Sequence, residues 1–192
     1  MSIQMIDERP NVLDGNRIIY MSGEFNEQKA EVIVTKLLAF ECMNPARDIL
    51  LIIDSYGGIV DSFVAIHDTI KLLRCKVATC CIGKAMSCGQ LLLVSGENGK
   101  RFITPNSRVM VHEFSAGDYG KLSDIEISLN ENKRLQKAIW ETLNIKYTKL
   151  TKKDLDEMKV RDTYLTAKEC LDRGLVDHII TEPSVLYKNI NI

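Results

Sequence analysis

The sequence predicts a single α/β domain built around a largely parallel sheet. Short apolar runs of strand length alternate with longer segments in which apolar residues recur every three or four positions, as in βαβ units. The runs DILLIID (48–54) and KVATCCIG (76–83) are apolar without alternation, which indicates strands covered on both faces. The chain has 192 residues, 45% of them hydrophobic, and can bury one sizeable core. We therefore treat residues 1–192 as one domain.

The first half of the chain begins with a short polar arm, residues 1–16, and then alternates strand and helix. Residues 17–21 are predicted to form a strand, and the helix after it is capped by Asn26. The strand over 48–54 ends at a double-glycine turn. Apolar residues at helical spacing then predict a helix that leads to the strand over 76–83. The helical segments of this half are 28–40 and 60–74.

The second half contains the longest predicted helix, over 123–146, within a region 115–146 that also includes a glycine-containing loop. A shorter helix opens near Ser87, and RVMVH (108–112) predicts one more strand. Two capping boxes, Thr151-x-x-Asp154 and Thr166-x-x-Glu169, begin the last helices, and Gly174 ends the second before a strand over 175–180. The tail, 183–192, is expected to be loosely held.

Composition excludes several classes of function. A formal net charge of −1 and a pI near 6.3 give no cationic surplus for nucleic acid or anionic lipid. The chain shows neither a secretory leader nor an apolar segment of membrane-spanning length, so we expect a cytoplasmic protein. Cysteines within apolar runs are expected to be free thiols, and without paired Cys/His knuckles we expect no metal. The six cysteines are Cys42, Cys75, Cys80, Cys81, Cys88 and Cys170.

Ser87 is the candidate nucleophile. It lies in GKAMSCG, where a buried strand meets a helix and where Gly83 and Gly89 relax the backbone on either side. Such a junction presents a hydroxyl beside free amide N–H groups at the positive end of a helix dipole, as acyl transfer requires. The structural alternative is a serine that only caps the helix.

His112 and Asp162 are the candidate partners of Ser87. His112 ends an apolar strand, where catalytic groups of parallel sheets collect, and Asp162 lies in a loop before a capped helix. A histidine hydrogen-bonded at the sheet margin and a solvated loop acid are the structural alternatives. We assign the other histidines, His67 on a helix and His178 in a late strand, to structural roles.

These residues lie within longer blocks by which the sequence resembles the ClpP family, the proteolytic subunits of the caseinolytic (Clp) protease. The resemblance runs from about residue 17 to residue 180, and its Ser, His and Asp fall on Ser87, His112 and Asp162 in the family's chain order. The blocks that carry it are AFECMNPARDILLIIDSYGG, AIHDTI, CIGKAMSCGQLLLVSGENGKRFITPNSRVMVHE, SDIEI and RDTYLTAKECLDRGLVDHI.

The resemblance implies a ClpP/crotonase-like fold of repeated β-β-α and βαβ units, with a serine endopeptidase site and no cofactor. The backbone N–H groups of Gly58 and Cys88 would form the oxyanion hole. An extended polypeptide substrate would lie as an added strand beside Gly57, Ile59 and Phe114. The structural alternative for Gly57 and Gly58 is an ordinary turn that ends the strand.

The resemblance also implies partners. Rings of seven subunits would stack in pairs as a tetradecamer, with 115–146 as the handle between the rings and the active sites inside a chamber. An AAA+ Clp-type ATPase would unfold and deliver substrates.

Departures from the family pattern bear on assembly more than on chemistry. The family's SPGG is SYGG here, with Tyr56, and its HQP is HEF, with Glu113 and Phe114. Val160 replaces an acid that makes an inter-ring contact, and the arm before residue 17 is short for a pore-gating hairpin. Two alternatives follow from the same residues: a non-catalytic ring component, and a crotonase-like protein of coenzyme A chemistry.

Overall fold

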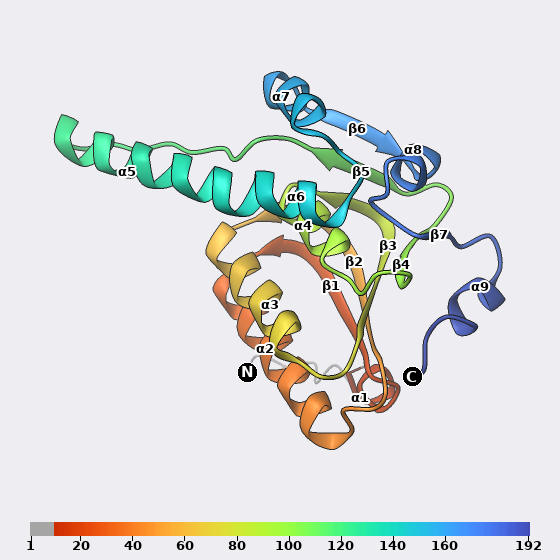
Figure 1. The fold of residues 1–192 in the computed structure, drawn as a ribbon. Coiled ribbons are helices and arrows are strands. Elements are labelled where there is room, and N and C mark those ends of the chain that lie inside the picture. The colour runs from red at the N-terminus through yellow and green to blue at the C-terminus, as the bar shows by residue number, and fades with distance from the viewer. Residues whose placement is uncertain (1–9) are drawn as a thin grey trace, which may run out of the picture.

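The computed structural model describes residues 10–192, which form a mixed α/β fold around a mostly parallel seven-stranded sheet (Figure 1). The predicted N-terminal arm therefore lies largely outside the described residues. In chain order the strands are β1 (Ile18–Phe25), β2 (Ile49–Gly58), β3 (Val77–Met86), β4 (Arg101–Ile103), β5 (Arg108–Val111), β6 (Thr163–Thr166) and β7 (His178–Ile179).

β3 divides the sheet in two. Its first half, Thr79 to Cys81, pairs with β4 in the main path β1-β2-β3-β4-β7, whereas Lys84 to Met86 pair with β5. Gly83 lies between these halves with a φ of 78°, a conformation that glycine adopts without strain. β5 then pairs with β6 in the antiparallel direction, although the other strand pairs are parallel. The second half of β3 thus carries a separate branch of sheet.

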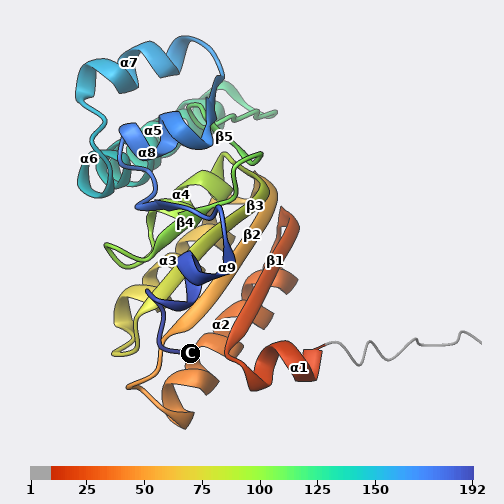
Figure 2. The ribbon, with the colours of Figure 1, turned by 90° about the vertical axis from the view of Figure 1, so that its right-hand side faces the viewer.

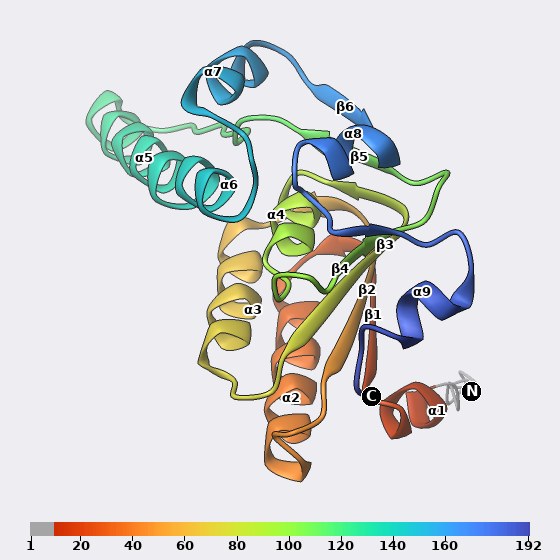
Figure 3. The ribbon, with the colours of Figure 1, turned by 45° about the vertical axis from the view of Figure 1, so that its right-hand side comes forward.

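The helices lie mainly on one side of the main sheet, where α2 and α3 run along β1 and β2 (Figure 3). The helix that includes α5 extends away from this body at its upper end (Figure 1). In chain order the helical segments are α1 (Pro10–Gly15), α2 (Glu27–Met43), α3 (Val60–Leu72), α4 (Cys88–Val94), α5 (Leu122–Leu135), the π-helical turn η1 (Gln136–Glu141), α6 (Thr142–Tyr147), α7 (Lys152–Val160), α8 (Ala167–Asp172) and α9 (Pro183–Tyr187).

The large core lies between the sheet and the helices, and α4 is buried along its whole length. A smaller apolar cluster occupies the opposite face, where Leu50, Cys80 and Phe102 meet the C-terminal residues Leu186 and Ile190 (Figure 2). Each face of the central strands is therefore covered, as the unbroken apolar runs predicted.

Several local expectations are confirmed. The Asn26 side chain accepts the Lys29 N–H at the start of α2, and Thr151 and Thr166 each form a complete capping box. The long helix begins one residue earlier and ends one later than expected, at Leu122 and Tyr147, but a π-helical turn interrupts it.

The C-terminal tail, expected to be loosely held, makes specific contacts with the sheet in the structure. Asp48 N–H donates to the Asn191 carbonyl at 2.8 Å, and Asn191 N–H returns a bond of 2.9 Å to the Asp48 carboxylate. Ile190 is 8% exposed on the smaller apolar cluster. The few apolar residues of the tail find a matching apolar strip on the sheet, which the tail's own composition did not reveal.

No helix in the described part of the chain is long and apolar enough to cross a membrane.

Candidate active site

Ser87 occupies the turn between β3 and α4, in a strained conformation with φ 53° and ψ −124°. Its N–H donates to the Met110 carbonyl of β5 at 3.1 Å, and its own carbonyl accepts the Gln90 N–H at 2.9 Å. A serine seldom adopts a positive φ, and such strain persists only where the surroundings over-determine the backbone. The turn leaves the side chain half-buried, between the end of one strand and the beginning of a helix.

Gly57 makes room for this turn. A Cβ atom added to Gly57 would lie 2.6 Å from Ser87 Cβ and 2.9 Å from the Met86 carbonyl oxygen, and the residue has a φ of 105°. Both the space and the conformation exclude a side chain. The double-glycine turn is therefore the feature that lets the ends of β2 and β3 approach each other at Ser87.

The pairing of β5 with β6 brings His112 toward Asp162. Val111 is opposite Thr163 in this antiparallel ladder, so the residues just beyond, His112 and Asp162, share one end of it. His112 Nδ1 lies 3.6 Å from Asp162 Oδ1, and the two side chains are 20% and 55% exposed. His112 Nε2, on the other side of the ring, is buried and makes no hydrogen bond within the described residues.

The order of the strands places Ser87 and His112 at the same edge of the sheet. Met86 pairs with Met110, so Ser87 and His112 follow neighbouring strands of one sheet. No hydrogen bond joins their side chains in the part of the chain that the structure describes. Catalytic hydrogen bonds of unliganded enzymes are commonly long and tighten in the substrate complex.

The Gly58 backbone points toward α4. Ile59 N–H donates to the Phe25 carbonyl at 3.0 Å, so β1 bonds to the residues on either side of Gly58 and leaves Gly58's own polar groups facing away. The Gly58 carbonyl accepts the Cys88 thiol at 3.4 Å. Cys88 N–H is at the first position of α4, where an amide has no partner inside the helix. The two backbone donors named from the sequence thus belong to adjoining segments.

The three positions predicted to bind a substrate strand have backbone N–H groups that already donate hydrogen bonds within the chain. Gly57 N–H is held by Ser55 Oγ at 3.0 Å, and Ile59 N–H by Phe25. Phe114 N–H is held by the Gln136 side chain at 2.7 Å. A peptide beside this edge would find these three donors already used, while the Ile59 side chain is 47% exposed.

The thiols around the site are poor nucleophiles. Burial raises the pKa of Cys88, next to Ser87, to about 11 and that of Cys81 to about 12. Both are therefore protonated at neutral pH. At the junction, the Ser87 hydroxyl is therefore a better candidate for the nucleophile than the neighbouring Cys88 thiol.

The other histidines pack against rings. His67 contacts Phe63 and Tyr147, and burial lowers its pKa, although its hydrogen bond to Asp68 acts in the opposite direction. His178 stacks on Phe102. Among the described residues, no three His, Cys, Asp or Glu side chains lie close enough together to hold a metal ion.

The fold and the junction at Ser87 define a class: α/β proteins of the ClpP/crotonase-like type, with a mostly parallel sheet and a candidate site at the ends of its strands. The chain belongs to the Clp protease family, since the family's model, described as Clp protease, matches residues 4–183. It is thus a member of the ClpP-type peptidases.

One part of the site was not predicted from the sequence. Gln136 and Trp140 lie in the π-helical turn, and each has a buried side-chain nitrogen, Nε2 and Nε1 respectively, with no hydrogen-bond partner among the described residues. The helical spacing of apolar residues places Trp140 in the core, but it contains no signal for the extra residue of a π turn.

Proposed function

We propose that this protein is a serine endopeptidase that cleaves peptides and unfolded polypeptides, with Ser87, His112 and Asp162 as its catalytic triad. The observation that carries the proposal is the position of His112 at the end of β5, which pairs with the strand that precedes Ser87. Its Nδ1 faces Asp162, while its Nε2 has no partner among the described residues. Membership of the Clp protease family supports the same reaction class.

The proposed reaction uses the two imidazole nitrogens in turn. His112 Nε2 takes the Ser87 proton as Oγ attacks the scissile carbonyl, and Asp162 stabilises the imidazolium through Nδ1–H. The N–H groups of Gly58 and Cys88 stabilise the oxyanion. His112 then protonates the leaving amine as the acyl-enzyme forms. Water, deprotonated by His112, attacks the ester and releases the acid with the proton returned to Ser87.

We further propose that the chain works as rings stacked into a tetradecamer and receives polypeptides from an AAA+ ATPase. The exposed apolar side chains of α5 support an assembly in which the helix contacts other subunits. Leu122 is 86% exposed, Ile127 68% and Leu129 48%, whereas no residue of α5 is buried within its own chain. Apolar residues in such numbers on one projecting helix are typical of an interface.

The test of the catalytic proposal is covalent labelling. A fluorophosphonate should modify Ser87 stoichiometrically, and Ser87→Ala or His112→Ala should abolish cleavage of a short fluorogenic peptide. Ser115→Ala, in the exposed loop after His112, and His178→Ala are matched controls and should keep full activity. Unchanged turnover in the Ser87 or His112 variant would contradict the mechanism.

A non-catalytic ring component is the second candidate function. The 3.6 Å separation of His112 and Asp162 and the 55% exposure of the acid favour it, because an active triad holds its carboxylate in a hydrogen bond. Native mass spectrometry with and without the label separates the candidates. A fourteen-subunit mass with one adduct per chain supports the peptidase, and rings that neither label nor cleave support the second candidate.

A further inference from the structure

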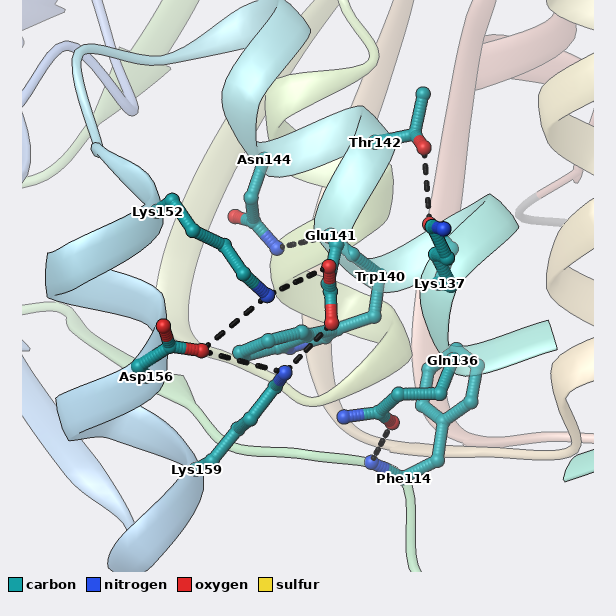
Figure 4. A network of polar contacts seen from close by, with 10 residues as sticks. All are labelled: Phe114, Gln136, Lys137, Trp140, Glu141, Thr142, Asn144, Lys152, Asp156 and Lys159. Carbon is teal, nitrogen blue, oxygen red and sulfur yellow. Dashed lines mark hydrogen bonds and ion pairs between the residues drawn. The ribbon is translucent and has the colours of Figure 1, made fainter. Parts of the chain in front are cut away.

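The π-helical turn η1 joins two parts of the long helix that runs from Leu122 to Tyr147. A π turn inserts an extra residue into an α-helix and is frequent at functional sites. Gln136 begins the turn and Glu141 ends it. Figure 4 shows that these two side chains extend to different segments of the chain.

Gln136 holds the segment that follows His112. Its Oε1 accepts the Phe114 N–H at 2.7 Å, and Phe114 is two residues beyond His112 (Figure 4). The stretch from 112 to 119 has no regular secondary structure, so the ladder of β5 ends before it. The amide of Gln136 therefore ties the irregular segment after the histidine to the helix.

Glu141 holds the helix that precedes Asp162. Its two carboxylate oxygens accept Lys152 Nζ at 2.8 Å and Lys159 Nζ at 2.5 Å, and both lysines belong to α7. The carboxylate is 14% exposed. Burial alone would raise its pKa, but the hydrogen bonds from the two lysines outweigh burial and the pKa lies below its usual value. α7 ends at Val160, two residues before Asp162.

The same two lysines make further contacts, within α7 and with the π turn. Asp156 lies 3.2 Å from Lys152 Nζ and 3.5 Å from Lys159 Nζ, so the lysines bridge two acids. Lys159 Nζ also lies 5.8 Å from the centre of the Trp140 ring, which is itself in the π turn. A partly buried network of four charges resists displacement more than an isolated surface pair does.

We propose that Gln136 and Glu141 are positioning residues that together set the separation of His112 and Asp162. His112 and Asp162 lie fifty residues apart in sequence. The segment after His112 is bonded to Gln136 at one end of the π turn, and the helix before Asp162 is bonded to Glu141 at the other end. The inference rests on the proposed peptidase function, because it assigns these residues a purpose in the His–Asp contact. Displacing a catalytic group by about 1 Å costs roughly 100-fold in rate, so a brace at this point affects catalysis without touching substrate.

Glu141→Gln tests the arm that leads to Asp162. The substitution preserves shape and removes both ion pairs. We expect kcat for a short peptide to fall roughly tenfold while KM stays within about twofold, because the side chain of Glu141 contacts the helix that leads to Asp162 and not the proposed substrate positions. Lys152→Met, which leaves the Lys159 contact, should cause a smaller fall. Glu131→Gln is the matched control, since it removes an exposed ion pair with Arg134 on the same helix and should leave kcat unchanged.

Gln136→Met tests the arm that leads to His112. The variant keeps the length of the side chain but loses the acceptor for Phe114 N–H, so kcat should fall and KM should rise, because Phe114 adjoins the proposed substrate strand. Gln136→Glu retains an acceptor oxygen and should restore kcat to within about threefold of the parent. If Met and Glu at this position behave alike, the hydrogen bond is not what positions the segment.

Crystal structures of the parent chain and of the Glu141→Gln variant separate this inference from the proposed function. We expect a longer His112 Nδ1 to Asp162 Oδ1 distance in the variant, and this distance can be measured even in a chain that cleaves nothing. An unchanged distance together with unchanged kcat overturns the inference. Absence of cleavage by the parent chain overturns the proposed function alone.

Discussion

The helices α4 and α5 differ in burial. Every residue of α4 is buried, and Ser87 precedes it in a turn bounded by Gly57, Met86 and Met110. No residue of α5 is buried, and the segment before it, from 113 to 121, is largely exposed (Figure 1). The candidate nucleophile thus adjoins the buried helix α4, whereas the His–Asp pair lies at the end of the β5–β6 ladder, just before the exposed segment.

This contrast shows that different interactions hold the two halves of the candidate site in place. Close packing determines the place of Ser87, because even a single carbon added at Gly57 would overlap with the Ser87 side chain. A few polar contacts of partly exposed side chains determine the place of Asp162. We therefore expect substitutions near Ser87 to lower the free energy of unfolding, and substitutions near Asp162 to lower the catalytic rate at nearly constant stability.

The largest effect is expected for Gly57→Ala. The new Cβ would lie 2.6 Å from Ser87 Cβ in a residue with φ 105°, so overpacking and backbone strain should together lower the free energy of unfolding by about 2 to 4 kcal/mol. Urea denaturation measures this, and fluorophosphonate labelling of Ser87 should fall in parallel. Gly117→Ala, where nothing lies within 4 Å, is the control and should change stability by less than about 0.5 kcal/mol.

Asp162→Asn should separate rate from stability. An amide cannot stabilise the imidazolium of His112, so we expect kcat to fall by roughly 100- to 10,000-fold. The side chain is 55% exposed, and the thermal midpoint should therefore hardly move. Asp172→Asn, which removes an exposed pair with Lys168, is the control. Full activity in the Asp162 variant would show that another group orients the imidazole.

Gln90→Leu probes the contact that joins the two regions. Gln90 Nε2 of α4 donates to Asn144 Oδ1 of α6 at 2.9 Å, and both residues are almost fully buried. Loss of the donor leaves a buried oxygen unsatisfied and should lower the free energy of unfolding by about 1 to 3 kcal/mol. Adding Asn144→Leu should recover part of this cost. A single variant as stable as the parent would mean that water replaces the bond.

The smallest effect is expected at Glu41, which lies near the C-terminal end of α2. The backbone N–H of Cys75 and the Arg74 side chain hold its pKa at about 2, below the usual 4.5. A lowered pKa contributes stability that is present above pH 4.5 and lost as the pH falls toward 2. The advantage of the parent over Glu41→Gln in urea should therefore shrink between pH 7 and pH 3, with peptide cleavage at pH 7 unaffected. An advantage that does not depend on pH contradicts this.

Much of the fold was accessible from local pattern. The apolar runs 48–54 and 76–83 became the two central strands, and Asn26, Thr151 and Thr166 cap the helices they were expected to begin. The short strands β4 and β6 were missed, because neither RFI nor TYLT forms an apolar run long enough to stand out beside its loops. Their hydrogen bonds depend on neighbours that only the folded sheet supplies.

The candidate site was accessible in its residues but not in its geometry. The sequence by itself determined the order of Ser87, His112 and Asp162 and the strand-to-helix junction of the first, since both are properties of short contiguous motifs. The tertiary structure alone decided that Gly57 abuts Ser87, that β6 brings Asp162 to His112, and that a π turn is attached to both segments of the pair. The physical reason is range: periodicity and capping reflect neighbours within a turn or two, whereas register and close contact depend on how distant segments pack.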